Sequence, residues 1–191
     1  MKMTKTKAID SIDFKKLFEL MHPGFFEKPY IRELPDSEVF DEMILPLGAP
    51  DGQSYKKTLD GSITFGFFTG DTAELKKAVS QVDEGWTDIF DGSQRVYCGF
   101  VGGKTASFCI IDDMGEYDSE IGRIKVGGPG CVGTLPEYRN RGIALTMIKR
   151  AGTILKNEGF DISWIHQTGA ARWYEKLGYR VVLRWNRNGI I

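Results

Sequence analysis

The residues best suited to bind an anionic ligand stand together, between an apolar strand pattern and a long helical pattern. They form the segment Arg139-Asn140-Arg141-Gly142-Ile143-Ala144. The first turn of a helix leaves backbone N–H groups unpaired and carries partial positive charge. A glycine there lets a ligand approach the backbone, and arginines add forked donors that match phosphate oxygens. The pattern therefore predicts a pyrophosphate site at a helix N-terminus, although a plain strand–turn–helix with surface arginines fits it too.

The glycine spacing in this segment differs from two common nucleotide-binding motifs. The segment has neither the Gly-x-Gly-x-x-Gly of dinucleotide-binding folds nor the Gly-Lys-Ser/Thr of a phosphate-binding loop. The small side chain of Ala144 leaves space next to Gly142. We therefore expect a phosphorylated cofactor that neither motif describes.

The elements that must position this segment alternate between strands and helices from Ile63 onward. Two apolar runs around Gly102-Gly103 indicate a β-hairpin. Strands are predicted at residues 63–68, 95–101, 106–111, 124–134 (with an interruption at 127–130), 161–167 and 179–185. Helices are predicted from Asp71 to Val82, around 86–90, from Ala144 to Leu155 and from 169 to 177, with an acidic loop at 112–120. This order implies a layered α/β (α+β) fold.

The first sixty residues have a different pattern and are predicted to be a partly helical N-terminal extension. Apolar residues at helical spacing indicate a short helix from Phe14 to Met21, ended by His22-Pro23-Gly24. A second helix is predicted over Asp36 to Leu45, followed by turns at 48–52. We therefore divide the chain into an extension at 1–60 and a main domain at 61–191.

The composition indicates one globular core and excludes some classes of partner. Of the 191 residues, 41% are hydrophobic and 27% charged, close to the average of globular proteins. The formal net charge of −1 lacks the basic excess of nucleic-acid-binding proteins, so we expect no nucleic-acid partner.

Cysteine and histidine usage indicates neither a disulfide framework nor a metal site. The three cysteines form no Cys-x-x-Cys pair, and the chain has only His22 and His166. The basic start lacks the apolar core of a secretion signal, and no apolar run reaches membrane-spanning length. We therefore expect a cytoplasmic protein with free thiols, no metal and no membrane partner.

Two segments in the correct order resemble the GNAT superfamily of N-acetyltransferases. The first runs from Val132 to Ala144 and matches the cofactor motif Gln/Arg-x-x-Gly-x-Gly/Ala, with a flanking Pro-Glu-Tyr-Arg. The second, Ala170 to Tyr179, is similar to the family's Tyr-Glu-Lys-Leu-Gly-Phe segment, with Tyr179 in place of Phe. The resemblance covers residues 61–191 and implies a mixed central sheet flanked by helices.

The resemblance implies that the cofactor is acetyl-CoA. In the family, the strand before the motif pairs with the pantetheine arm, and the motif itself holds the pyrophosphate. A glycine-rich bulge commonly splays the strand from its neighbour, and residues 127–130 are either such a bulge or a turn in a poor strand. The implied coenzyme A-binding residues are Val132, Gly133, Thr134, Arg139, Asn140, Arg141, Gly142, Ile143 and Ala144.

The resemblance also implies a proton donor, and it leaves the general base open. Tyr174 matches the family's tyrosine acid, and a phenol suits a coenzyme A thiolate because their pKa values are close. Histone-type members carry a glutamate where this strand has Gly128. The base is therefore His166, whose pKa suits the task, or a water relay, or unnecessary because the amine arrives neutral. His166 as a structural residue and Tyr174 as a packing residue are the alternatives, and Cys131 is interpreted as packing.

The resulting prediction is direct acetyl transfer from acetyl-CoA to a primary amine of a small molecule or protein. A catalytically inactive coenzyme A-binding sensor, or an enzyme using a longer acyl donor, remains open. The acidic residues at 112–120 would attract a cationic amine, or they are simply solvated. A homodimer is considered because relatives commonly form one.

Overall fold

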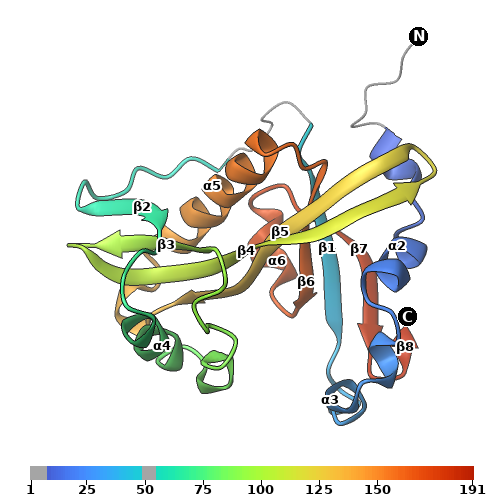
Figure 1. The fold of residues 1–191 in the computed structure, drawn as a ribbon, viewed down its shortest axis with the longest axis horizontal. Helices are drawn as coiled ribbons and strands as arrows, with labels where there is room; N and C mark the ends of the chain where they lie inside the picture. The colour runs from blue at the N-terminus through green and yellow to red at the C-terminus, as the bar shows by residue number, and fades with distance from the viewer. Residues whose placement is uncertain (1–7, 49–54) are drawn as a thin grey trace. The chain divides into compact units, whose positions relative to one another are not determined.

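The computed structural model describes residues 8–48 and 55–191, which fall into two compact units (Figure 1). Unit 1 contains the described residues up to Gly48 together with Asp113–Gly128 and Leu155–Ile191. Unit 2 contains Tyr55–Asp112 and Pro129–Ile154. The predicted turns at 48–52 fall mostly outside the described residues.

Within the described residues, eight strands form one mixed sheet flanked by helices, as predicted. The strand order is β2-β3-β4-β5-β6-β1-β7-β8. The strands are β1 (Phe40–Pro46), β2 (Ile63–Phe67), β3 (Val96–Val101), β4 (Lys104–Ser119), β5 (Gly122–Thr134), β6 (Ile162–Thr168), β7 (Arg180–Asn186) and β8 (Gly189–Ile190). The α-helices are α2 (Phe14–Met21), α3 (Pro29–Arg32), α4 (Thr72–Ser80), α5 (Ile143–Asn157) and α6 (Ala171–Glu175). None of the helices described is long and apolar enough to cross a membrane.

In unit 2, α4 and α5 cover opposite faces of the strands (Figure 1). The α4 face has its own apolar core, in which Leu75 and Val79 pack with Cys98 and Phe108. Asp71 is the N-cap of α4, as predicted, and its carboxylate accepts from the N–H of Ala73 at 2.8 Å. The predicted hairpin of β3 and β4 and the strand β2 are also confirmed.

In unit 1, a second apolar core lies between α2 and the strands. Leu17 and Phe18 of α2 are buried in it together with Ile44 of β1 and Trp164 of β6. The predicted helix from Phe14 to Met21 is confirmed. So are the predicted strands at the positions of β6 and β7 and the short helix α6.

The predicted helix over Asp36 to Leu45 is wrong, because Phe40–Pro46 is the strand β1. This strand lies between β6 and β7 and pairs antiparallel with both. Its central residues Glu42, Met43 and Ile44 are all buried. A strand covered on both faces shows a continuous apolar run, and periodicity alone does not distinguish such a run from a buried helix.

The predicted acidic loop at 112–120 is also wrong, since β4 continues to Ser119 and forms a hairpin with β5. Basic side chains of β5 compensate the acidic ones of β4. Lys125 lies 3.5 Å from Asp113, and Arg123 lies 2.7 Å from Glu116. Opposite charges on paired strands stabilise the pairing, so the acidic residues occupy a strand.

The predicted interruption at 127–130 is not a break, because β5 runs on to Thr134. The backbone instead departs from extended geometry at Cys131, where φ is 46°. Pairing of β5 with β6 is parallel and covers Val126↔Ile162 and Gly127↔Ser163.

Candidate functional site

The predicted pyrophosphate segment forms a left-handed turn that leads into α5 in unit 2. Asn140 and Gly142 have φ values of 61° and 81°, and α5 begins at Ile143. The N–H of Thr146 donates to the carbonyl of Gly142 at 3.2 Å. The N–H groups of the three preceding helix residues have no intrahelical acceptor, as at any helix start. The turn therefore offers the backbone donors and partial positive charge that a phosphate binds.

Residues at the start of unit 2 lie across this turn. The hydroxyl of Tyr55 donates to the carbonyl of Gly142 at 3.5 Å, and the ammonium of Lys57 donates to the carbonyl of Asn140 at 3.5 Å. A Cβ at Gly142 would lie 2.5 Å from Cδ of Lys57 and 2.8 Å from the hydroxyl oxygen of Tyr55. The left-handed φ and this close approach both require glycine at position 142.

The strand before the turn is tied to its neighbours through its carbonyl groups. The carbonyl of Gly133 accepts from the Ser107 hydroxyl at 2.7 Å, and that of Thr134 accepts from Nε of Arg139 at 3.2 Å. Arg139 therefore lies against the strand end. All nine predicted cofactor-binding residues, Val132 to Thr134 and Arg139 to Ala144, lie in unit 2.

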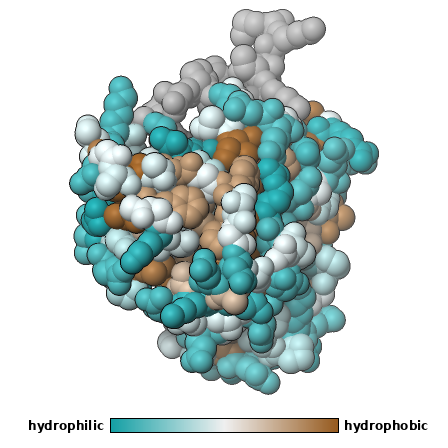
Figure 2. Space-filling view, turned by 60° about the vertical axis from the view of Figure 1, so that its left-hand side comes forward, coloured by the Kyte–Doolittle hydropathy of each residue, from teal (hydrophilic) through white to brown (hydrophobic). Residues whose placement is uncertain are grey.

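A cavity of about 630 Å³ in unit 2 borders the cofactor segment without containing these residues. It lies against α4, at Glu74 and Lys77, and reaches Glu137 and Tyr138 of the loop between Thr134 and Arg139. Figure 2, in which the left-hand side of Figure 1 comes forward, shows hydrophobic patches bordered by hydrophilic residues. The mixed lining indicates no particular ligand.

The predicted acid Tyr174 lies in unit 1, on α6, with a buried ring. The ring packs edge-on against Trp173 and Tyr179, at centroid distances of 4.8 Å and 5.8 Å. The hydroxyl of Tyr179 is 2.7 Å from that of Ser163 on β6. Aromatic packing therefore fixes the position of the Tyr174 ring.

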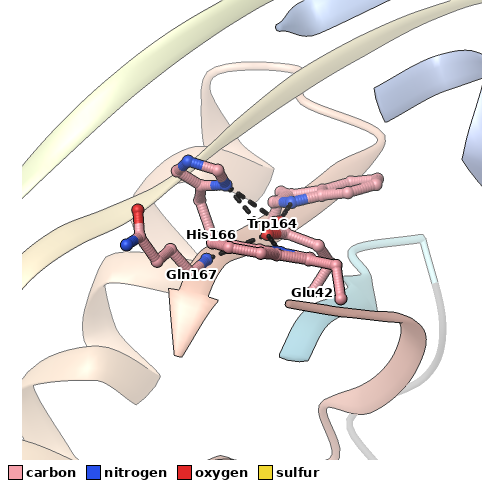
Figure 3. A network of polar contacts seen from close by, with 5 residues as sticks. Glu42, Trp164, His166 and Gln167 are labelled. Carbon is pink, nitrogen blue, oxygen red and sulfur yellow. Dashed lines mark hydrogen bonds and ion pairs between the residues drawn. The ribbon is translucent and has the colours of Figure 1, made fainter. Parts of the chain in front are cut away.

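The predicted base His166 lies on β6 in unit 1 and pairs with a residue that the sequence analysis missed. Nδ1 of His166 is 3.0 Å from each carboxylate oxygen of Glu42 on β1 (Figure 3). Glu42 is completely buried, whereas the His166 side chain is 26% exposed. A lone carboxylate inside the apolar run of residues 40–46 was the available signal, because carboxylates are almost never buried without partners.

A second histidine stacks on His166. The rings of His22 and His166 lie 4.3 Å apart at an interplanar angle of 17°. Burial, and then the neighbouring His166, lowers the pKa of His22 to about 4. His22 is therefore uncharged at neutral pH.

The strand position at which histone-type relatives carry a glutamate is sterically closed in this protein. A Cβ at Gly128 would lie 1.8 Å from the carbonyl oxygen of Trp164. No residue with a side chain fits there, so a carboxylate base on this strand is excluded at position 128.

The three cysteines are free thiols, as predicted, and all are protonated at neutral pH. Burial raises the pKa of Cys131 to about 11, with a further contribution from Asp83 and Asp112. Burial also raises the pKa of Cys98 to about 12 and that of Cys109 further. None is therefore activated as a nucleophile.

Comparison with known proteins agrees with the predicted family. Residues 93–181, just under half of the chain, match the family model described as an acetyltransferase (GNAT) domain. No curated protein matches the chain.

Among solved structures, three similar folds share 19–20% sequence identity with the chain and cover 78% of it. The first is a GCN5-related glucosamine N-acetyltransferase region of a fungal multi-domain beta-N-acetylglucosaminidase, with a TM-score of 0.62. The others are a GCN5-related N-acetyltransferase from Sphaerobacter thermophilus, at 0.57, and a GNAT-family acetyltransferase from Novosphingobium aromaticivorans, at 0.51.

The chain spans only 20%, 50% and 62% of those three chains. Identities this low show a common fold, and the family match covers both segments that carried the resemblance except the first residue of α5's own C-terminal half and the strand end beyond 181. Residues 93–181 of this chain are therefore an acetyltransferase domain of the GNAT family.

Proposed function

We propose that the chain transfers an acetyl group from acetyl-CoA directly to a primary amine of a small molecule or a protein. The observation that carries this proposal is the left-handed turn at Asn140–Gly142 at the start of α5, inside the family-matched region. The turn supplies backbone donors, and Gly142 keeps side-chain atoms away from them.

The residues at the turn fit a phosphorylated cofactor. Arg139 and Arg141 bring two guanidinium groups, and Lys57 adds an ammonium at the rim. Within the described residues, Lys57 has no carboxylate partner closer than 4 Å and contacts the carbonyl of Asn140. We therefore propose that Lys57 and Tyr55 join the nine predicted residues in holding coenzyme A.

The proposed chemistry assigns one proton transfer to each of two side chains of unit 1. Bound acetyl-CoA would supply an acetyl thioester as the acyl donor. His166 would accept a proton from the acceptor amine, and the phenol of Tyr174 would donate one to the departing thiolate sulfur. No covalent enzyme intermediate is required, in keeping with the protonated state of Cys131.

The acceptor class is tested with a panel of amines. The panel begins with glucosamine, because one similar structure is described as a glucosamine N-acetyltransferase region, and adds polyamines, amino acids and lysine peptides. Release of free coenzyme A thiol that depends on the amine supports the proposal. Tyr174→Phe is expected to lower kcat by about 10²-fold or more while acetyl-CoA affinity stays the same.

A catalytically inactive coenzyme A-binding sensor is the second candidate. The closed position at Gly128 favours it, since the strand offers no carboxylate base there. Acetyl-CoA binding without amine-dependent thiol release across the whole panel would support the sensor and contradict the transferase.

A further inference from the structure

Glu42 is a buried carboxylate that accepts hydrogen bonds on both oxygens from groups that only donate. The indole N–H of Trp164 donates to Oε2 at 2.6 Å, and that of Trp185 donates to Oε1 at 2.8 Å. The backbone N–H of Gln167 also donates to Oε1, at 3.0 Å. Neither an indole nor a backbone N–H can accept a proton.

These contacts determine the protonation state of the pair that Glu42 forms with His166. A protonated Glu42 would direct an O–H at one oxygen, although each oxygen already faces an N–H donor. Glu42 is therefore an acceptor on both oxygens, and the Nδ1 of His166 that contacts it must carry a hydrogen. In the neutral ring, Nε2 is then left with a lone pair.

The His166 ring cannot turn easily to exchange its two nitrogens. Its faces are occupied by His22, stacked at 4.3 Å, and its edge meets Phe25 at a centroid distance of 5.2 Å. Figure 3 shows the second ring nitrogen pointing away from Glu42. The charged or titratable neighbours of this pair are His22, which is uncharged at neutral pH, and Lys28, which lies near His22.

We propose that Glu42 is a positioning residue that holds His166 in the Nδ1–H tautomer and so presents Nε2 as a proton acceptor. This proposal rests on the proposed transferase function for the identity of the proton donor, which is the acceptor amine. As the new C–N bond forms and the C–S bond breaks, Nε2 takes the amine proton. Glu42 then stabilises the imidazolium, and the sulfur receives its proton from Tyr174. Both side chains return to their starting states by exchange with solvent.

The tautomer is measured directly by ¹⁵N nuclear magnetic resonance of the histidine side chains, with signals assigned by His22→Phe and His166→Gln. The wild-type protein at neutral pH is expected to show His166 with hydrogen on Nδ1 and a lone pair on Nε2. A wild-type His166 with hydrogen on Nε2 would overturn the proposal, without requiring any variant to fold or any substrate to be known.

Glu42→Gln tests the role of the carboxylate, and Asp41→Asn is its matched control. Asp41 is the preceding residue on β1 and pairs with Arg184 at 2.8 Å, so its variant loses the same charge without touching His166. In Glu42→Gln we expect the tautomer of His166 to change, the acid limb of kcat/KM to shift, and kcat to fall on the order of 10²-fold. Asp41→Asn should retain the wild-type tautomer and pH profile.

An unchanged tautomer and pH profile in a folded Glu42→Gln variant would contradict the proposal. The same readout in Trp185→Phe, which removes one donor and keeps the carboxylate, is expected to retain the Nδ1–H tautomer. Absence of acetyl transfer by the wild type would count against the transferase function, whereas the resonance measurement decides the Glu42 assignment separately.

Discussion

At the scale of single residues, Gly128 explains why the general base is sought on another strand. A side chain at this position would meet the backbone carbonyl of Trp164, which cannot move aside without displacing β6. The buried pair of Glu42 and His166 lies in the same unit and provides the carboxylate and the imidazole that β5 lacks. The carboxylate in this protein thus acts through a histidine.

Gly128→Ala is expected to destabilise the fold by about 3 kcal/mol or more, because the new methyl overlaps a backbone oxygen. Gly130→Ala on the same strand is the control, since a Cβ there meets no atom within 4 Å. Urea unfolding of both variants measures the difference. Equal stability of the two variants would show that the contact with Trp164 is absent in solution.

His22 should make stability depend on pH below neutrality. Its pKa is about 4 in the folded protein and 6.5 in an unfolded chain, so the unfolded state binds more protons between these values. Stability therefore falls as pH drops from 6.5 to 4. The full shift corresponds to about 3 kcal/mol, which solvent screening of this partly exposed ring reduces to about 1–2 kcal/mol.

Unfolding experiments at pH 7 and pH 4.5 measure this effect in wild type and His22→Phe. The wild type is expected to lose about 1–2 kcal/mol more than the variant on acidification. Parallel losses in both proteins would mean that His22 titrates normally in the folded state.

At the scale of elements, the parts of the fold with local signals could be predicted. Apolar residues at helical spacing and a following glycine located α5, and the hairpin of β3 and β4 followed from Gly102-Gly103. The capping Asp71 located the start of α4. Each of these signals lies within a few residues of the element that it predicts.

The elements that could not be predicted depend on distant partners. β1 is a strand because β6 and β7 flank it, and the second half of β4 is a strand because Lys125 and Arg123 compensate its acidic residues. The Glu42 site is built the same way, from donors on β6 and β7 more than a hundred residues away. No local pattern in the sequence contains these contacts.

Ile44→Ala tests whether β1 belongs to the core of unit 1. Ile44 is fully buried in the cluster with Trp164, so the cavity should cost about 2–5 kcal/mol. Val39, which is 42% exposed and directly precedes the strand, is the control, and Val39→Ala should change stability by less than about 0.5 kcal/mol. Chemical denaturation gives both values, and a similarly small effect at Ile44 would contradict its buried position.

At the scale of the whole molecule, the two units carry different parts of the proposed function. Unit 2 contains the turn at 139–144 and the residues Tyr55 and Lys57 that lie across it. Unit 1 contains Glu42, His166 and Tyr174. Because β4 and β5 contribute residues to both units, the proposed cofactor site and the proposed proton-transfer groups share two continuous strands.

The central claim is that acetyl-CoA binds at the turn before α5, and calorimetric titration tests it most directly. Arg139→Ala/Arg141→Ala is a better variant than a side chain at Gly142, whose left-handed φ and contact with Lys57 would also disturb folding. Lys56→Ala is the control, because Lys56 is exposed beside Lys57 and has no contact with the turn among the described residues. We predict micromolar binding to wild type and Lys56→Ala, weakened by about 10²-fold in the double variant. No binding to the wild type, or equal binding to all three proteins, would contradict the claim.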